Sequence, residues 1–316
     1  MAKRLLIRCV LDARREITPD VVELRFVPTI RTAVPPYHGG AHTLLRLDGG
    51  GVRQYSLCGP PDGSAYVIAV RRQDDGRGGS VELHRAPPGA EYFLSHPQQE
   101  FGLYHDADRH LFVAGGIGVT PVLSMVRELA VGGLASAAGV HLYARDAEHA
   151  PYAAELSALG ADVHVHLRTA PRRATVDEVV PAGRPAGTHL YTCGPQSLMD
   201  DVLRAAEAWP TGTVHHESFV APAAPAGAIL GEEFPVRLAL SGRDVVVGPR
   251  ETLLRRLLDE GVDVAHACEG GICGTCVLDV AKGEVDHRDS CLTDETRAHA
   301  IVACVSRGKG ALTVNA

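Results

Sequence analysis

The stretch Cys268-Glu-Gly-Gly-Ile-Cys273-Gly-Thr-Cys276, followed far downstream by Cys304, decides the fold of the C-terminal part of this chain. Its spacing is C-x4-C-x2-C…C, the arrangement of the four thiolate ligands of a plant-type [2Fe–2S] cluster. Two bridged irons need two thiolates each, so one compact loop supplies three ligands and a distant strand supplies the fourth. The glycines of the loop let backbone N–H groups point at the cluster sulfurs and tune the reduction potential. A structural zinc site is the alternative, but zinc prefers paired C-x2-C ligands, so the spacing favours an iron–sulfur cluster.

Residues 231–316, which contain this loop, resemble plant-type ferredoxins along their whole length. A hairpin pattern (FPVRLAL, SGRD, VVVG) opens the segment, and a short amphipathic helix (ETLLRRLLDEG) precedes the cysteines. The resemblance implies a β-grasp ferredoxin domain in which the four cysteines named above are the metal ligands. Cys291 lies between the third and fourth ligands, and two interpretations of it remain open. It is either a buried thiol without a ligand role or an alternative ligand that is sensitive to oxidation.

The composition of the chain restricts its class. Its 316 residues suffice for two or three domains, and 45% hydrophobic and 22% charged residues are ordinary for a globular protein. A net charge of −7 without a long basic run argues against a nucleic-acid partner. The first residues lack the apolar run of a signal peptide, so five of eight cysteines clustered after residue 267 indicate a metal site rather than disulfides. No apolar stretch is long enough to span a bilayer, and we expect a cytoplasmic monomer without a membrane partner.

Three patterns of sequence follow one another. Up to about residue 103, short apolar strands alternate with turns rich in Pro and Gly, which is typical of an antiparallel sandwich or barrel. From about residue 108 to residue 219, strands alternate with helical segments such as VTPVLSMVRELA, which implies a parallel sheet covered by helices. APAAPAGA at residues 221–228 has the composition of a linker. We therefore expect domains at residues 1–105, 106–220 and 231–316, with the linker at 221–230.

The strand Arg53-Gln54-Tyr55-Ser56-Leu57 resembles the R-x-Y-S/T-L strand of ferredoxin-reductase-like flavin domains. The Tyr ring can pack against the flavin, the Ser hydroxyl can hydrogen-bond its edge, and the Arg can hold a phosphate through several donors. Downstream, Gly76-Arg77-Gly78-Gly79-Ser80 offers a cation, a hydroxyl and exposed N–H groups, which suit a terminal phosphate. Each motif alone is equally consistent with an ordinary strand or turn. Together, ahead of a nucleotide-binding pattern, they indicate flavin binding.

A second ligand motif, Gly115-Gly116-Ile117-Gly118-Val119-Thr120-Pro121, follows a strand and opens a helix. Its glycines permit a tight turn and the close approach of a pyrophosphate, with Thr120 as the expected N-cap and Pro121 as the first helical residue. A later strand ends in Tyr191-Thr192-Cys193-Gly194-Pro195. The two motifs together resemble the pyridine-nucleotide domain of the same reductase superfamily. The resemblance implies that Cys193 lies beside the nicotinamide and that Thr120 and Ser56 are catalytic; for Cys193 a buried packing role is the alternative.

The adenosine end of this predicted site is ambiguous. Asp146, in Tyr143-Ala144-Arg145-Asp146 at a strand end, favours a free 2′-hydroxyl, whereas Arg145 can accept a 2′-phosphate. The residues leave both coenzymes open, and the family resemblance implies NADH. Glu217 and Phe219 end the last strand of this region. The resemblance places such an aromatic residue near the flavin, and a core role for Phe219 is the alternative.

The order of flavin, nicotinamide and iron–sulfur motifs resembles the phthalate dioxygenase reductase family across essentially the full chain. The resemblance implies an antiparallel flavin-binding β-barrel, a parallel-sheet nicotinamide-binding domain and a C-terminal β-grasp ferredoxin domain. It also implies an oxidoreductase that passes electrons from NADH through FMN and a [2Fe–2S] cluster to a terminal oxygenase component. NADH delivers two electrons as hydride and the cluster accepts one, so the flavin must lie between them.

Several alternatives remain open at this point. The partner is a Rieske-type oxygenase, an O-demethylase or a cytochrome P450. A stand-alone NADH oxidase or diaphorase that reduces small acceptors, and an electron carrier that uses only the ferredoxin part, are rival functions. The residues do not name the oxygenase or its substrate.

Overall fold

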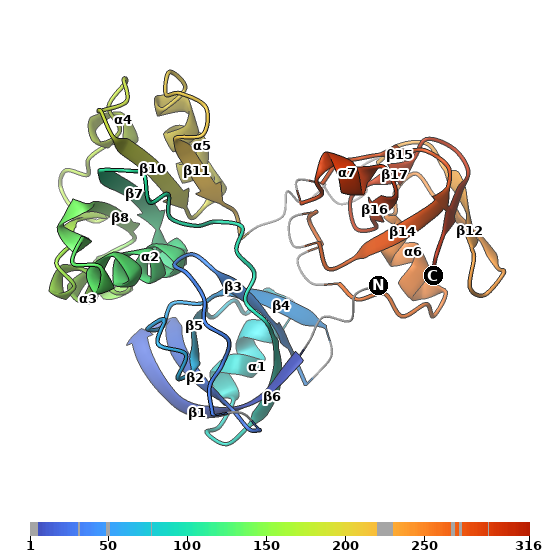
Figure 1. Ribbon diagram of the computed structural model, residues 1–316, viewed down its shortest axis with the longest axis horizontal. Coiled ribbons are helices and arrows are strands. Elements are labelled where there is room, and N and C mark those ends of the chain that lie inside the picture. The colour runs from blue at the N-terminus through green and yellow to red at the C-terminus, as the bar shows by residue number, and fades with distance from the viewer. Residues whose placement is uncertain are drawn as a thin grey trace. The chain divides into compact units, whose positions relative to one another are not determined.

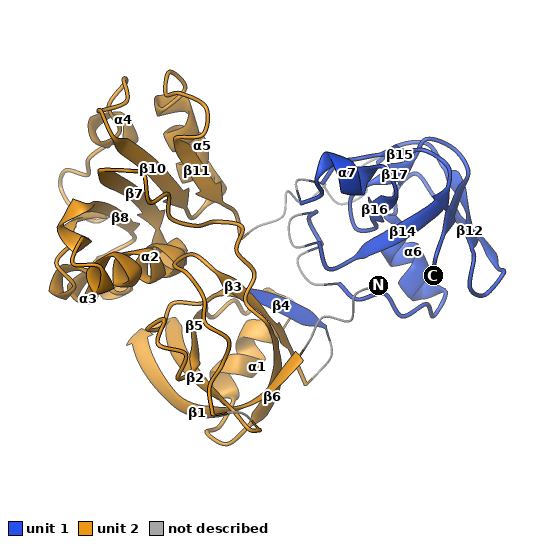
Figure 2. Ribbon diagram, in the orientation of Figure 1, with its two compact units in different colours: residues 1–3, 50–54, 220–316 blue, residues 4–49, 55–219 orange. Residues whose placement is uncertain are grey.

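The computed structural model describes residues 6–30, 32–48, 51–76, 78–219, 230–266, 269–271, 274–289 and 291–316. The chain divides into two compact units, shown in Figure 2. The larger comprises residues 4–49 and 55–219, and the smaller comprises residues 220–316 together with residues 1–3 and 50–54. None of the helices in the described part of the chain has the length and apolar character needed to cross a bilayer.

The N-terminal region folds as a six-stranded antiparallel sheet in the order β4-β3-β6-β1-β2-β5 (Figure 1). Its strands are β1 (Leu6–Thr18), β2 (Val21–Pro28), β3 (His42–Arg46), β4 (Val52–Ser56), β5 (Tyr66–Arg71) and β6 (Glu91–Ser95). Side chains of the strands alternate between the core and the surface. In β2, Val22, Leu24 and Phe26 are buried in the core, and the residues between them are partly exposed. An antiparallel bridge between Leu57 and Ile68 joins the two edges of the sheet, as a closed barrel requires.

One element of the barrel was not predicted, the short helix α1 (Gly79–Arg85) between β5 and β6. Gly78 precedes it in the left-handed region, at φ 79°, and Leu83 is fully buried in the barrel core. Seven residues make only about two turns, so the sequence has too few apolar positions to reveal a helical period. The predicted phosphate loop at residues 76–80 is therefore the entry to a helix.

The next region is a five-stranded parallel sheet in the order β11-β10-β7-β8-β9. Its strands are β7 (Arg109–Gly115), β8 (Ala138–Ala144), β9 (Asp162–Leu167), β10 (Thr188–Cys193) and β11 (Val214–Glu217). The main helices are α2 (Val119–Val131), α3 (Ala153–Ala158), α4 (Val176–Val179) and α5 (Gln196–Ala205). Helices α2 and α3 bury side chains in the core on one face of the sheet, and α4 and α5 do so on the other. Because β10 returns to lie beside β7, the carboxyl ends of β7 and β10 form the switch point where open sheets bind ligands.

The barrel and the parallel sheet share a hydrophobic core within the larger unit. Val67 and Ala69 of the barrel belong to the same cluster as Phe112 of β7 and Met125 of α2. The expected boundary near residue 105 thus marks a change of sequence pattern between two regions that are packed together. The domain limits remain predictions, and the linker expected at 221–230 falls almost entirely outside the described residues.

The smaller unit is built on a five-stranded mixed sheet in the order β13-β12-β18-β14-β16. These strands are β12 (Phe234–Leu238), β13 (Asp244–Val247), β14 (Val277–Lys282), β16 (Ala300–Val302) and β18 (Leu312–Val314). The remaining elements are β15 (Val285–Asp286), β17 (Arg307–Gly308), α6 (Leu253–Asp259) and α7 (Asp294–Arg297). Strand β12 pairs parallel with β18 and antiparallel with β13, and Leu253 and Leu257 of α6 enter the core. This is the predicted β-grasp arrangement.

A buried guanidinium ties the smaller unit together. Arg307 is 3% exposed and donates hydrogen bonds to the carbonyls of Glu251, Glu232 and Gly248 at 2.7, 2.9 and 3.0 Å. Its guanidinium also lies 5.0 Å from the centre of the Phe234 ring. A buried cation is tolerated because its donors are paired, so Arg307 fixes the start of the unit to its last strands.

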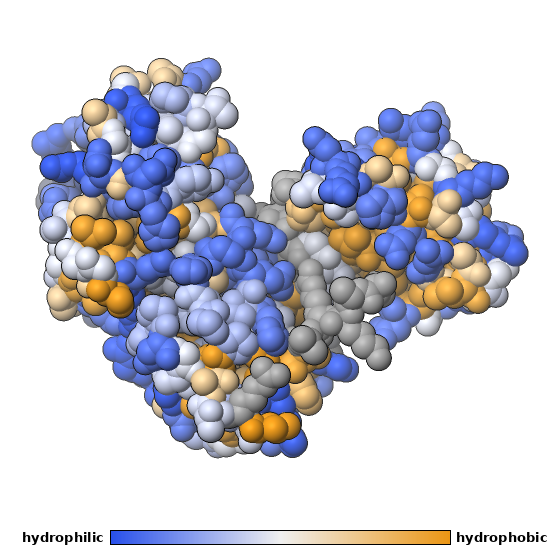
Figure 3. All heavy atoms as spheres, viewed as in Figure 1, coloured by the Kyte–Doolittle hydropathy of each residue, from blue (hydrophilic) through white to orange (hydrophobic). Residues whose placement is uncertain are grey.

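Large apolar side chains at the surface are spread over separate elements. The most exposed are Ile30 at 87% and Val131 and Leu240 at 80% each. On the face drawn in Figure 3, hydrophobic and hydrophilic residues are interspersed on both units. The apolar residues that stabilise the fold are therefore in the cores, and single exposed ones are normal for a protein surface.

Candidate functional site

The two predicted nucleotide motifs are in direct contact at the switch point. Gly118 follows β7, and Cys193, Gly194 and Pro195 end and follow β10. A Cβ added to Gly118 would lie 2.3 Å from the Cys193 carbonyl oxygen, and one added to Gly115 would lie 2.5 Å from the Pro195 ring. Glycine is required at both positions because no other residue fits this approach. The contact brings the start of α2 to the carboxyl end of β10.

Thr120 does not cap α2, and the sequence prediction of its capping role is wrong. The helix begins at Val119 with Gly118 as its N-cap, and no side chain makes a capping hydrogen bond. Thr120 is the second helical residue, and its buried hydroxyl donates to the Ile117 carbonyl at 3.0 Å. Pro121 is the third helical residue rather than the first, still within the turn that needs no backbone N–H. Thr120 therefore stabilises the glycine loop from within.

A buried polar cluster connects the barrel with the end of the parallel sheet. Cys193 pairs in register with Glu217 of β11, and both residues are buried. Burial and the nearby Glu100 raise the pKa of Glu217 to about 8, while the Ser56 hydroxyl of the barrel acts to lower it. Burial and the neighbouring Glu217 raise the pKa of the Cys193 thiol well above its usual value. Both groups are therefore largely uncharged at neutral pH.

Two buried polar side chains at this place, Ser56 and Glu217, fit a bound polar ligand. The two side chains interact with each other, but among the residues that the structure describes neither Ser56 Oγ nor Glu217 Oε2 makes a well-formed hydrogen bond. Polar atoms without a good partner in a protein interior cost free energy, so the neighbouring Ser56 and Glu217 side chains fit the polar edge of a bound flavin or nicotinamide. Glu217 was not predicted as a site residue. The sequence places Glu217 at a strand end. Its part in the buried cluster follows only from its pairing with Cys193 and its interaction with Ser56.

The predicted flavin residues lie on and directly after β4. Ser56 and Leu57 are buried, whereas Arg53 and Tyr55 are partly exposed and share one side of the strand by alternation. The Arg53 guanidinium donates to the Val52 carbonyl at 2.9 Å. The strand therefore offers a partly exposed cation and an aromatic ring on one side, as the flavin prediction requires.

The predicted phosphate loop has a structural role of its own. The Ser80 hydroxyl accepts from the Gln73 N–H at 3.0 Å and donates to the Gln73 carbonyl at 3.2 Å, which closes the turn before α1. Gly79 opens the helix, and Arg77 lies outside the described residues. Binding of a phosphate by Arg77, Gly79 and Ser80 remains a prediction.

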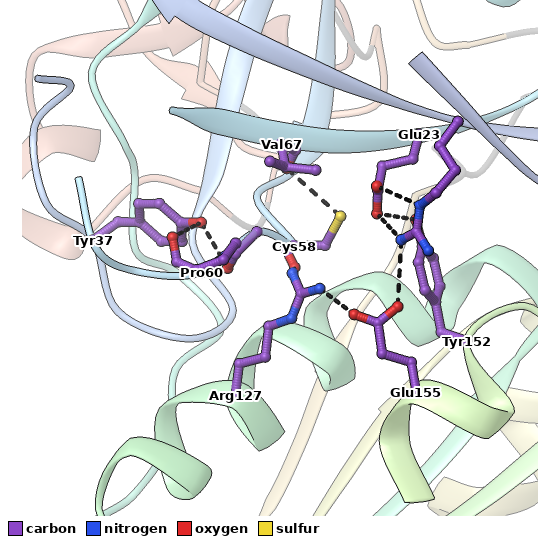
Figure 4. A network of polar contacts seen from close by, with 10 residues as sticks. Glu23, Tyr37, Cys58, Pro60, Val67, Arg127, Tyr152 and Glu155 are labelled. Atoms are coloured by element: carbon purple, nitrogen blue, oxygen red, sulfur yellow. Dashed lines mark hydrogen bonds and ion pairs between the residues drawn. The ribbon is translucent and has the colours of Figure 1, made fainter. Parts of the chain in front are cut away.

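A charged network holds the flavin strand against the nucleotide helix (Figure 4). Arg127 of α2 donates to the carbonyl of Cys58, two residues after Ser56, and to the carboxylate of Glu155 on α3. Arg15 of the barrel joins Glu155 at 3.4 Å and Glu23 at 2.9 Å. The Arg127 side chain is only 14% exposed, so solvent screens these contacts less than those of a surface pair. Helix α2, which begins at the glycine loop, is thereby fixed to the strand that carries the flavin motif.

The two residues predicted at the adenosine end are paired with each other at 3.3 Å, but only Arg145 lines a cavity there. Arg145 lines a cavity of about 480 Å³ together with Gly115, Gly116 and Pro195. The carboxylate of Asp146 instead accepts hydrogen bonds from the ring and the backbone N–H of His149. Phe219, two residues beyond the end of β11, is 38% exposed.

The cluster ligands are described in part. Cys276 and Cys304 are buried in the smaller unit, and the Gly271 N–H points at the Cys304 sulfur at 3.3 Å. A Cβ on Gly271, which has φ 75°, would lie 2.6 Å from the Val305 side chain, so this part of the loop requires glycine. An N–H aimed at a thiolate sulfur fits an iron–sulfur ligand. Cys268 and Cys273 lie outside the described residues.

Comparison with known proteins identifies the chain. The family described as "2Fe-2S iron-sulfur cluster binding domain" matches residues 236–309. Phthalate dioxygenase reductase of Burkholderia cepacia is 36% identical over 310 residues, which cover 96% of this chain and 95% of that protein.

The chain belongs to the phthalate dioxygenase reductase family.

Three further similarities support this assignment. The solved structure of phthalate dioxygenase reductase matches with a TM-score of 0.74 and 35% identity over 98% of both chains, which confirms the expected fold class. The heme-dependent oxidative N-demethylase beta subunit of Ectopseudomonas mendocina is 39% identical over 307 residues, 95% of this chain and 96% of that one. The family described as "Dimethylamine monooxygenase subunit DmmA-like, N-terminal domain" matches residues 94–216. The chain is thus an oxidoreductase of the reductase class predicted from its sequence.

The buried carboxyl of Glu217 predicts a pH-dependent stability. In the folded protein the Glu217 carboxyl keeps its proton up to about pH 8, whereas in the unfolded chain it ionises near its ordinary pKa of 4.5. The unfolded state therefore gains from deprotonation between these values, and its free energy falls relative to the folded state as pH rises. Compared with Glu217→Gln, the wild-type protein should lose about 2–4 kcal/mol of unfolding free energy between pH 5 and pH 8. Thermal unfolding of both proteins across this range measures the difference, and a pH-independent difference contradicts the raised pKa.

The network around Arg127 predicts a slower transfer of hydride when it is cut. Arg127→Met removes the cation beside Glu155 and leaves the buried Cys58 carbonyl without this donor, which should cost about 1–3 kcal/mol of stability. Flavin reduction by NADH should slow about tenfold or more, because a small displacement of the two regions misaligns the reacting rings. Arg204→Gln, which removes an exposed ion pair with Asp177, is the matched control. Stopped-flow reduction that is equally fast in both variants would show that Arg127 has no positioning role.

Proposed function

We propose that this chain is the reductase component of a multicomponent oxygenase or demethylase, carrying electrons from NADH through a flavin and a [2Fe–2S] cluster to a terminal partner. The observation that carries the proposal is the convergence of Ser56, Cys193 and Glu217, from a flavin-type barrel and a nucleotide-type sheet, at one buried place. A ferredoxin unit on the same chain would then accept the electrons from the flavin and pass them to the partner. FMN is the flavin that we propose, by family resemblance.

The residues at the switch point would bind and orient the coenzyme. The loop Gly115, Gly116 and Gly118 and the start of α2 would hold the pyrophosphate, and Gly194 and Pro195 border the same crevice. Thr120 keeps this loop in shape through its bond to Ile117. Cys193 would pack beside the nicotinamide as a neutral thiol.

The barrel residues would hold the flavin. Arg53 would bind its phosphate, Tyr55 and Leu57 would pack against its rings, and Ser56 would donate to its edge. Phe219 would cover the opposite face. The bound flavin supplies the conversion of a two-electron hydride transfer into single-electron steps. Burial of Ser56, Cys193 and Glu217 excludes water from this place, which protects the hydride from loss to solvent.

The ferredoxin unit would carry the cluster on Cys268, Cys273, Cys276 and Cys304. The Gly271 N–H stabilises negative charge on the Cys304 sulfur and thereby helps to set the reduction potential. Residues 231–316 contain ten Lys and Arg and fourteen Asp and Glu, so this unit is acidic. A partner with a basic docking patch, reached as a transient complex, suits this charge.

The terminal partner that we propose is an oxygenase or demethylase component, of the Rieske type or a cytochrome P450 as expected from the sequence. A haem-dependent amine demethylase is a second candidate. It is favoured by the N-demethylase relative at 39% identity and by the match of residues 94–216 to the dimethylamine monooxygenase family. We further propose that the protein is a cytoplasmic monomer.

The electron pathway predicts two separable phases in anaerobic stopped flow. Mixing the purified protein with NADH should first reduce the flavin and then the cluster. Cys193→Ala should slow the first phase about tenfold to a hundredfold, because the nicotinamide loses its positioning, and should leave the second phase at its wild-type rate. Cys9→Ala, which removes another fully buried thiol in the barrel core, is the control. An unchanged first phase in Cys193→Ala would reduce Cys193 to a packing residue, and a cluster that NADH never reduces would refute the pathway.

A further inference from the structure

The adenosine end of the coenzyme cavity is strongly basic. The cavity of about 480 Å³ beside the glycine loop has four arginines and one aspartate in its lining, namely Arg71, Arg145, Arg168, Arg173 and Asp20. The carboxylate of Asp20 accepts a hydrogen bond from the Thr18 hydroxyl at 2.8 Å. A dinucleotide whose only phosphates are its pyrophosphate does not require this many cations. The position of each arginine therefore indicates which part of the coenzyme it would contact.

Arg71 belongs to the pyrophosphate end. A Cβ on Gly116, in the glycine loop, would lie 3.9 Å from the Arg71 guanidinium. This places one cation and the N–H groups at the start of α2 where a pyrophosphate is expected. The other three arginines come from the ends of β8 and β9 and from the segment that follows β9.

Arg145 and Arg168 leave neighbouring strands at the same level. Ala144 of β8 pairs with Leu167 of β9, and each arginine directly follows its strand. The Arg168 N–H donates to the Ala144 carbonyl at 3.0 Å, which continues the pairing beyond the strand ends. Two guanidinium groups therefore project from adjacent carboxyl ends of a parallel sheet, the position at which such sheets recognise the adenosine ribose.

Arg173 lines the same cavity beside the ring of Tyr143. Its guanidinium carbon lies 4.7 Å from the centre of the Tyr143 ring, and Tyr143 lines the cavity as well. The Tyr143 hydroxyl is buried, and among the described residues it has no hydrogen-bond partner. Neither Arg168 nor Arg173 forms an ion pair within the described part of the chain. The site thus presents exposed, uncompensated cations and a buried hydroxyl without a partner.

The carboxylate of Asp146, next to Arg145, is shared between His149 and the Arg145 side chain. Asp146 Oδ1 accepts from His149 Nδ1 at 2.6 Å and from the His149 N–H at 3.1 Å. Its other oxygen lies 3.3 Å from the Arg145 side chain. Asp146 acts as the N-cap of η3 (Ala147–His149) and is absent from the cavity lining. It is therefore not available to bind a ribose 2′-hydroxyl as a free carboxylate would.

We propose that Arg145, Arg168 and Arg173 form a 2′-phosphate site, so that this reductase uses NADPH at least as well as NADH. The inference rests on the proposed reductase function and adds a coenzyme specificity that the family resemblance does not imply. A phosphate monoester carries up to two negative charges and matches several guanidinium forks, whereas a ribose hydroxyl uses none of these charges.

Binding of two nucleotides tests the site without turnover. In calorimetric titrations of the holoprotein, adenosine 2′,5′-bisphosphate should bind about tenfold or more tightly than adenosine 5′-monophosphate. Arg168→Gln and Arg173→Gln should each remove most of this difference. Arg172→Gln is the matched control, because Arg172 is adjacent in sequence, lies outside the cavity lining and pairs with Glu178 at 2.6 Å. Equal binding of the two nucleotides by the wild-type protein overturns the proposal.

Turnover provides the second measurement. With ferricyanide as acceptor, kcat/KM for NADPH should equal or exceed that for NADH, and Arg168→Gln should lower the NADPH value about tenfold more than the NADH value. A wild-type preference for NADH of tenfold or more overturns the proposal while leaving the reductase function intact. Failure of both coenzymes to reduce the flavin would instead refute the reductase function, and the nucleotide titrations would still decide the 2′-phosphate site.

Discussion

Helix α2 is fixed to other elements at its start and again two turns further along. The geometry of the larger unit depends on these two contacts. Its start touches the Cys193 carbonyl through Gly118, at a distance that only glycine permits. Arg127, two turns further along, fastens the same helix to the Cys58 carbonyl and to Glu155. Glu128 adds a contact with the Gly39 N–H of the barrel. One rigid element thereby sets the distance between the flavin strand and the nucleotide loop, which hydride transfer requires to within about an ångström.

The two ends of the coenzyme site use opposite electrostatics. At the reacting end, burial keeps Cys193 and Glu217 largely uncharged near neutral pH. The buried polar atoms of Ser56 and Glu217 there could hydrogen-bond a ligand. At the proposed adenosine end, the arginines are exposed and would bind the coenzyme through charge. Exposed arginines contribute affinity and specificity without stabilising the fold, whereas the buried end excludes water from the chemistry. On the proposed function, this division would let the chain select its coenzyme at a place separate from the reacting atoms.

Local patterns in the sequence predicted most of the architecture. Alternation in segments such as Val21–Pro28 predicts the barrel strands, and the C-x4-C-x2-C spacing predicts a ferredoxin unit that the comparisons confirm. Properties that depend on tertiary contacts were beyond reach. The burial of Glu217 against Ser56 joins residues 161 positions apart, and the engagement of Asp146 with His149 is a matter of local geometry that no motif encodes. Helix α1 is too short to show a helical period in the sequence. The predicted capping role of Thr120 is wrong because Gly118 is the N-cap of α2, which places Thr120 inside the helix.

The central claim is that one chain takes electrons in pairs and releases them singly through a flavin and a [2Fe–2S] cluster. Anaerobic titration of the purified protein with NADH, followed by optical and electron paramagnetic resonance spectra, counts these electrons directly. A flavin that stores two electrons and a cluster that stores one require about 1.5 equivalents of NADH per chain for full reduction. The account predicts this value together with the signal of a reduced [2Fe–2S] cluster. An end point at about one equivalent, with no signal from a reduced cluster, would contradict it.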